Sequence, residues 1–145
     1  MASQASSEDN AVESETSMNG RAIRWLASVQ GAYFAVTGLW PLIHMPSFLA
    51  VTGPKTDLWL VQIVGALICI PAAVAFLIAW HGRLRVENLV AVCGSAAVLC
   101  AADIIFVTRG TISPIYLLDA GVELALLIAW AVCNRWSRKR IRVSA

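Results

Sequence analysis

The chain has 145 residues, of which 59% are hydrophobic and 14% are charged, with a formal net charge of +2. An ordinary soluble domain carries about 25% charged residues, and its helices show one apolar stripe each. Here the apolar runs are close to membrane length, which is roughly 20 residues. The composition therefore argues against a soluble domain and predicts an all-α integral membrane protein.

Residues 1–20 precede the apolar runs and are rich in Ser and Glu, with acidic side chains but no Lys or Arg. A segment of this composition cannot bury enough apolar surface to fold, so it is predicted to be disordered. Its acidic start, without a short apolar run at the right distance, also argues against a signal peptide.

The membrane domain is predicted over residues 21–134 and is expected to be a four-helix bundle. Its transmembrane helices are predicted over residues 25–44, 58–80, 88–107 and 112–133. Between the first two spans, the Pro- and Gly-containing stretch WPLIHMPSFLAVTGPKTDLWLV predicts a polar hairpin.

The distribution of Lys and Arg predicts the orientation. One side of the membrane would hold nine of them, and the other would hold only Lys55 and Arg109. The nine are Arg21, Arg24, Arg83, Arg85 and the five in the tail 135–145. The positive-inside rule then places both termini in the cytoplasm. The basic tail directly follows a span, so it is interpreted as an anchor at an anionic membrane face and not as a nucleic-acid site.

Three ionisable residues fall inside predicted spans and are the first candidates for function: Asp103, Asp119 and Glu123. Asp103 lies roughly 9 Å below Arg109, and Asp119 roughly 10 Å past Ile112, at 1.5 Å rise per residue. Glu123 is one turn further along the face that carries Asp119. The three carboxyl groups are therefore predicted to share a pocket in the outer half of the membrane, where at least one should hold its proton at neutral pH.

Further polar residues complete this predicted pocket. Gln62 and His44 are expected at a similar outer depth. The rim would consist of Lys55, Asp57 and Arg109.

Structural interpretations stand beside the functional one. Asp103 could pair with Arg109, and Asp57 could cap the second span. Asp119 and Glu123 could be protonated donors that hold helices together. Small residues at four-residue spacing in the last two spans are interpreted as surfaces for bundle packing or self-association. They are Cys93, Ala97 and Ala101, then Gly121, Ala125 and Ala129.

The four cysteines lie in or at the end of apolar runs, and none belongs to a CxxC motif or a Cys/His cluster. Neither a metal site nor a disulfide framework is indicated, and no cofactor is expected.

The segments WPLIHMPSF, VTGPKTDLWLV and ISPIYLLD together resemble parts of small, largely uncharacterised bacterial four-helix inner-membrane proteins. In size and topology the chain is also similar to the DoxX-like group. The resemblance implies a four-helix fold in the bacterial inner (plasma) membrane, and it implies no particular chemistry.

The leading functional hypothesis is a small multi-pass membrane protein that binds a small ligand or a proton in the carboxylate pocket, or serves as an accessory subunit. Its expected partners are the lipid bilayer and a membrane complex or a second copy. One alternative is a membrane enzyme that uses Asp119 and Glu123 as acid and base on a lipid or quinone-like substrate. Another is a purely structural assembly protein.

Overall fold

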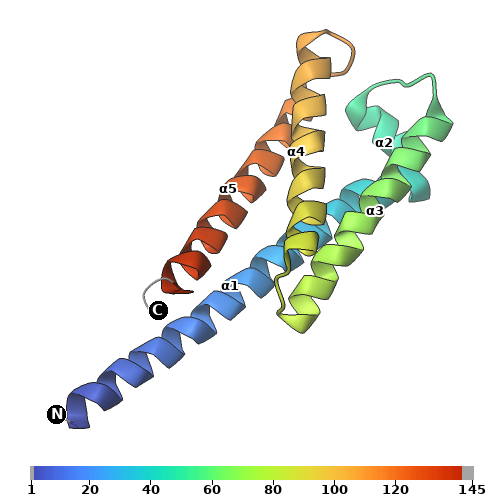
Figure 1. Ribbon diagram of the computed structural model, residues 1–145. Coiled ribbons are helices and arrows are strands. Elements are labelled where there is room, and N and C mark those ends of the chain that lie inside the picture. Colours follow the sequence, from blue (N-terminus) through green and yellow to red (C-terminus); the bar gives the residue numbers. More distant parts are fainter. Residues whose placement is uncertain (1, 142–145) are drawn as a thin grey trace.

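The computed structural model describes residues 20–134, so the predicted disordered segment (apart from Gly20) and the basic tail lie outside the described residues. The chain is helical, and its elements are shown in Figure 1. They are α1 (Ala2–Ile43), α2 (Met45–Thr52), α3 (Leu58–His81), α4 (Val86–Thr108) and α5 (Tyr116–Ile141).

Within the described residues, four helices are long and apolar enough to cross a membrane: Gly20–Ile43, Leu58–His81, Val86–Thr108 and Tyr116–Asn134. The prediction of an all-helical chain with four membrane-length helices is therefore confirmed. Large apolar side chains also remain on the outside, as in Trp25, which is 71% exposed, and Leu118, which is 69% exposed. Such a surface suits lipid and not water.

The four long helices alternate in direction (Figure 1). One end of the molecule carries α2 and the connection between α4 and α5, and we call it the Arg109 end. The opposite end carries the connection between α3 and α4, and we call it the Arg85 end.

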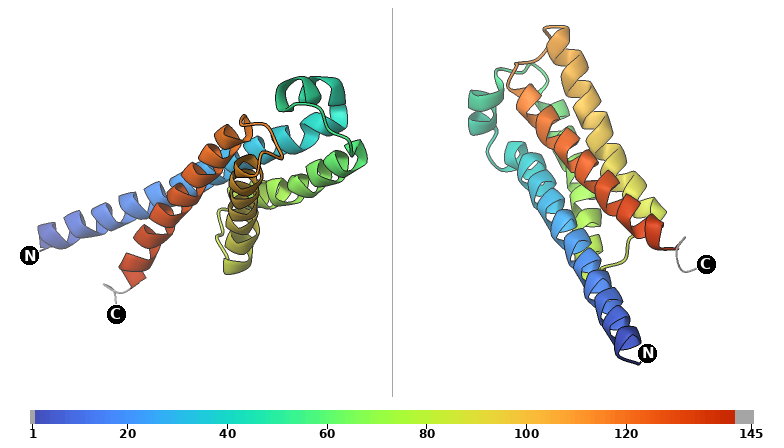
Figure 2. Two further views of the ribbon diagram at one scale, coloured as in Figure 1. Left: turned by 90° about the horizontal axis from the view of Figure 1, so that it is seen from above. Right: turned by 90° about the vertical axis from the view of Figure 1, so that its left-hand side faces the viewer.

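Each long helix contacts at least two others. The most extensive contact joins α1 to α3, followed by the contact of α4 with α5, while α3 also touches α4 and α1 also touches α5. Figure 2 shows α4 beside α5 and α3 crossing α1. The main core cluster lies between these helices and consists of Leu26, Ala27, Ala75, Ile78, Val92, Leu126 and Trp130.

Two glycines bring α1 and α3 together. A Cβ atom on Gly38 would lie 2.7 Å from the carbonyl oxygen of Gly65, and a Cβ atom on Gly65 would lie 2.6 Å from the carbonyl oxygen of Gly38. Real Cβ atoms do not approach backbone this closely, so the crossing requires glycine on both helices. This is the close approach that small residues permit in membrane helices.

The hairpin predicted between the first two spans contains a helix of its own, α2. Pro46 stands in its first turn, and the ring nitrogen Nδ1 of His44 accepts a hydrogen bond from the backbone N–H of Ser47 at 3.2 Å. Gly53, with φ of 88°, ends the helix. At the other hairpin, α5 begins at Tyr116 and not near Ile112, because Ser113 and Pro114 form a turn whose carbonyls accept from Tyr116 and Leu117.

Candidate functional site

Glu123 is the most unusual residue of the interior. Its side chain is 1% exposed, and neither carboxyl oxygen has a hydrogen-bond partner. Buried polar groups in proteins are nearly always hydrogen-bonded, and an unpartnered one destabilises the fold by about 1–3 kcal/mol. This residue is therefore not a packing donor, because it donates to no group in the described structure.

Asp119 lies one helical turn before Glu123 on α5 and is half-buried. Its Oδ1 accepts a hydrogen bond from the hydroxyl of Tyr33, which reaches across from α1. This bond ties the start of α5 to the middle of α1 and leaves the second oxygen of Asp119 available. The sequence interpretation had not considered Tyr33.

Asp103 brings the third carboxyl group from α4. It is 8% exposed, and its Oδ2 is buried without a hydrogen-bond partner. Within residues 20–134 Asp103 forms no ion pair with Arg109, so that structural interpretation of Asp103 is not supported. Both Asp119 and Asp103 lie close enough to Glu123 to act on it electrostatically.

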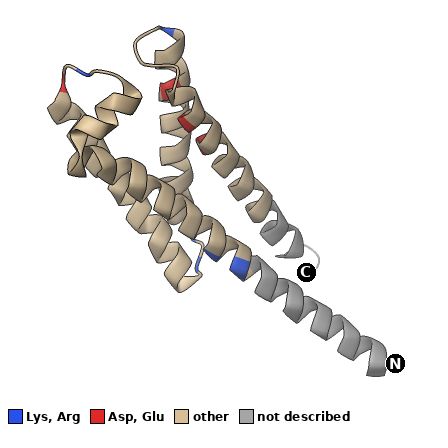
Figure 3. Cartoon of the chain, turned by 180° about the vertical axis from the view of Figure 1, so that it is seen from behind, with Lys and Arg blue, Asp and Glu red and all other residues tan. Residues whose placement is uncertain are grey.

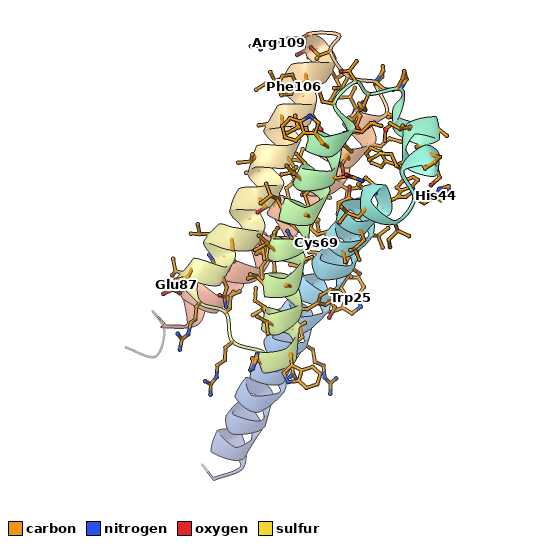
Figure 4. All side chains as sticks on the ribbon, turned by 90° about the vertical axis from the view of Figure 1, so that its right-hand side faces the viewer. Trp25, His44, Cys69, Glu87, Phe106 and Arg109 are labelled. Atoms are coloured by element: carbon orange, nitrogen blue, oxygen red, sulfur yellow. The ribbon has the colours of Figure 1, made fainter. Side chains whose placement is uncertain are left out.

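The three carboxyl groups thus come from two neighbouring helices, near the connection that joins them. Figure 3 shows acidic positions in the parts of α4 and α5 that lead to this connection. Figure 4 shows Arg109 at the same end of α4, far from Glu87 at the other. The cluster therefore belongs to the half of the molecule nearer the Arg109 end.

The predicted rim residues lie at this end, in different roles. The Nζ atom of Lys55 lies 5.0 Å from the ring centre of Tyr116, the first residue of α5, in a cation–π contact. Arg109 is exposed at the end of α4. Asp57 occupies the N-cap position of α3, but its side chain makes no capping hydrogen bond and accepts instead from Thr56.

Two of the predicted pocket residues do not join the carboxyl groups. Gln62 is exposed on α3. His44 is exposed and caps α2 through Nδ1, and Ser47 also accepts a hydrogen bond from the indole N–H of Trp40 at 2.8 Å. Gln62 is turned to the outside of α3, which the sequence spacing alone does not show.

A second polar group in the interior had no counterpart in the sequence interpretation. Gln30 is 0% exposed; its amide donates to the carbonyl of Val92 at 2.9 Å, and its Oε1 accepts from the indole N–H of Trp130 at 2.5 Å. These bonds connect α1, α4 and α5. A search for ionisable groups passes over glutamine, but a lone amide in the middle of an apolar run is the signal that could have identified it.

Two cavities lie away from the carboxyl groups. One, of about 250 Å³, is at the Arg85 end and is lined by Val74, Leu77, His81, Arg83, Arg85 and Asn88. The other, of about 620 Å³, runs along α1 to α2 and is lined by Ala35, Val36, Leu39, Trp40, Ile43, His44 and Ser47. The second is an open apolar groove whose walls suit a lipid chain.

The predicted small-residue surfaces point away from the other helices for most of their length. Ala97, Ala101, Gly121 and Ala125 are exposed, and a Cβ atom on Gly121 would meet nothing within 4 Å. Packing of α4 against α5 uses other positions, among them Cys100, whose thiol donates to the carbonyl of Ala120 at 3.5 Å.

In the described part of the chain, no three His, Cys, Asp or Glu side chains are arranged to hold a metal ion. A scan against protein-family models finds no match, and searches of curated proteins and of solved structures find none either. The geometry of Asp103, Asp119 and Glu123 is therefore the best indication of function.

Proposed function

We propose that the chain is a four-helix bundle of a bacterial inner membrane with both termini in the cytoplasm. The contacts of each long helix with at least two others support the bundle. The orientation is supported by the distribution of Lys and Arg. Nine of them are assigned to the Arg85 end and the two tails, and two to the Arg109 end.

A reporter fused after Ala145 tests this orientation. Alkaline phosphatase, which is active only outside the cytoplasm, is expected to be inactive there and active when inserted after Gly110. The reverse pattern would contradict the proposed topology.

We further propose that the function of this membrane protein is to bind and release a proton at Glu123, with Asp119 and Asp103 as its neighbours. The observation that carries the proposal is the complete burial of Glu123 with two unpartnered oxygens. An ionised carboxylate without a partner is strongly disfavoured inside a membrane, by about 3 kcal/mol on insertion scales. Such a group must bind either a proton or a cation.

A proton fits this site better than a larger ligand. It needs only one oxygen atom and no cavity, and the two cavities described above are lined by other residues. Two further carboxyl groups nearby can accept the proton when Glu123 releases it, and one of them, Asp119, has its position fixed by the bond with Tyr33. Interacting carboxyl groups titrate as a coupled set, so binding of a proton at Glu123 depends on the charges of the other two.

Labelling with an apolar carbodiimide tests the proposal. The O–H of a protonated carboxyl group adds across one C=N bond of the reagent and rearranges to a stable N-acylurea, so the peptide gains the whole reagent mass. In detergent, mass spectrometry is expected to show one adduct on Glu123 whose yield falls as the pH is raised.

Two variants control this experiment. Glu123→Gln is expected to lose the adduct, whereas Asp57→Asn, at an exposed carboxyl group, is expected to keep it. An unmodified Glu123, or a yield that does not change with pH, would show that this residue does not exchange a proton.

A further inference from the structure

We infer that Glu123 exchanges its proton with the Arg109 end only, because a contact between Gln30 and Trp130 closes the site toward the Arg85 end. The inference rests on the proposed proton site and adds its direction of access. It is carried by the order of side chains along one face of α5.

That face consists of residues spaced alternately by three and four positions, which places them in one row along the helix. They are Tyr116, Asp119, Glu123, Leu126 and Trp130. The row is polar from its start as far as Glu123 and apolar beyond it, apart from the indole N–H of Trp130. Glu123 is therefore the last carboxyl group on this face before the closed part of the core.

The polar half of the row leads to the surface. Tyr116 and Asp119 are half-buried, and so are Tyr33, which donates to Asp119, and Lys55, which lies over the ring of Tyr116. Hydroxyl and carboxyl groups at successive turns can pass a proton between them, directly or through water. This sequence of groups connects Glu123 with the Arg109 end.

The apolar half is blocked. Leu126 and Trp130 are 6% and 2% exposed, and both belong to the core cluster that contains Val92 and Ile78. The indole N–H of Trp130 is bonded to Gln30, and the amide of Gln30 is bonded to Val92, so each of these polar groups already has a partner. From Glu123 to Trp130 the row extends about 10 Å without a free polar side chain.

The titratable groups around Glu123 fit this direction. Asp119 lies one turn before it on α5, and Asp103 acts on it from α4. The hydroxyl of Tyr33 on α1 is bonded to Asp119, and the thiol of Cys100 on α4 is bonded to the carbonyl of Ala120. Asp119 and Asp103 both lie in the half of the molecule nearer the Arg109 end (Figure 3). The titratable side chains of α3 are Cys69, which is bonded to the carbonyl of Gly65, and His81, which is bonded to the carbonyl of Leu77. Toward the Arg85 end, the next side chains are those of the core cluster.

Proteoliposomes with a different pH on each side test the inference. The protein carries a C-terminal tag, and vesicles of one orientation are identified by protease removal of that tag. The carbodiimide crosses the membrane, so the yield at Glu123 reports the protonation of that residue. The yield of the adduct is expected to change with the pH on the side opposite the tag. It is expected to be independent of the pH on the side of the tag.

Substitutions at Trp130 test the barrier itself. Trp130→Ala leaves a space that water can enter. In this variant the yield of the adduct on Glu123 is expected to depend on the pH of both sides. Trp130→Phe keeps most of the side-chain volume and is expected to remain dependent on one side. If Trp130→Ala does not fold, Gln30→Ala is used in its place, because this substitution removes the hydrogen-bond partner of the indole.

The outcomes separate this inference from the proton site. If the wild-type yield follows the pH on the side of the tag, or on both sides, the inference is overturned while the proton site stands. A folded Trp130→Ala protein that still responds to one side only would overturn the assignment of the barrier. Failure of the proton site itself would be seen earlier, as the absence of a pH-dependent adduct in detergent.

Discussion

Replacing Glu123 by Met is expected to stabilise the protein while it abolishes the carbodiimide adduct. The change removes two buried oxygens that have no hydrogen-bond partner and fills the site with an adaptable apolar side chain of similar length. The expected gain in free energy of unfolding is about 1–3 kcal/mol, the usual destabilisation by an unpartnered buried polar group. The thermal unfolding midpoint in detergent, followed by the fluorescence of the six Trp residues, measures it.

Two other substitutions serve as controls. Glu123→Gln keeps an unpartnered polar group, so its free energy of unfolding is expected to change little. Glu87→Met, at an exposed position of α4, is expected to change stability by less than about 0.5 kcal/mol. A clear loss of stability in Glu123→Met would mean that Glu123 contributes to packing, and that its burial does not indicate a proton site.

Alanine at Gly38 or Gly65 is expected to disrupt the contact of α1 with α3. In each case the new Cβ atom would meet a backbone carbonyl on the other helix at less than 3 Å, and a backbone cannot rotate away as a side chain can. The helices must separate, and the expected loss of stability is about 1–3 kcal/mol. The same thermal measurement detects it as a lower unfolding midpoint.

Gly94 provides the matched control, because a Cβ atom there would meet nothing within 4 Å. Gly94→Ala lies in the middle of α4, where alanine is a better helix former by about 1 kcal/mol, so no loss of stability is expected. Equal destabilisation by all three substitutions would show that the effect does not come from the crossing of α1 and α3.

The helical class of the chain could be read from the sequence because apolar runs of membrane length allow few other structures. The small α2 could not, because Pro46 and Gly53 are signals for a turn as well as for the ends of a short helix. In the structure the side chain of His44 caps the start of α2. That contact depends on backbone angles and not on composition.

The carboxyl cluster was predictable in part. Asp119 and Glu123 are one turn apart on any helix, and the short connection after Asp103 makes α4 and α5 neighbours. The rotation of each helix about its own axis was not predictable, and it is this rotation that turns Gln62 outward and brings Tyr33 to Asp119. Four nearly uniformly apolar helices carry little information about which face turns inward.

The bond between Gln30 and Trp130 joins residues that are 100 positions apart in the chain. At a synthesis rate of about 5–20 residues per second, Trp130 in the last span is therefore made on the order of 5–20 seconds after Gln30 in the first. Throughout that interval Gln30 is in the membrane without the indole that later covers it. Biogenesis of this protein thus depends on a late event: only when the final helix enters can the polar interior close.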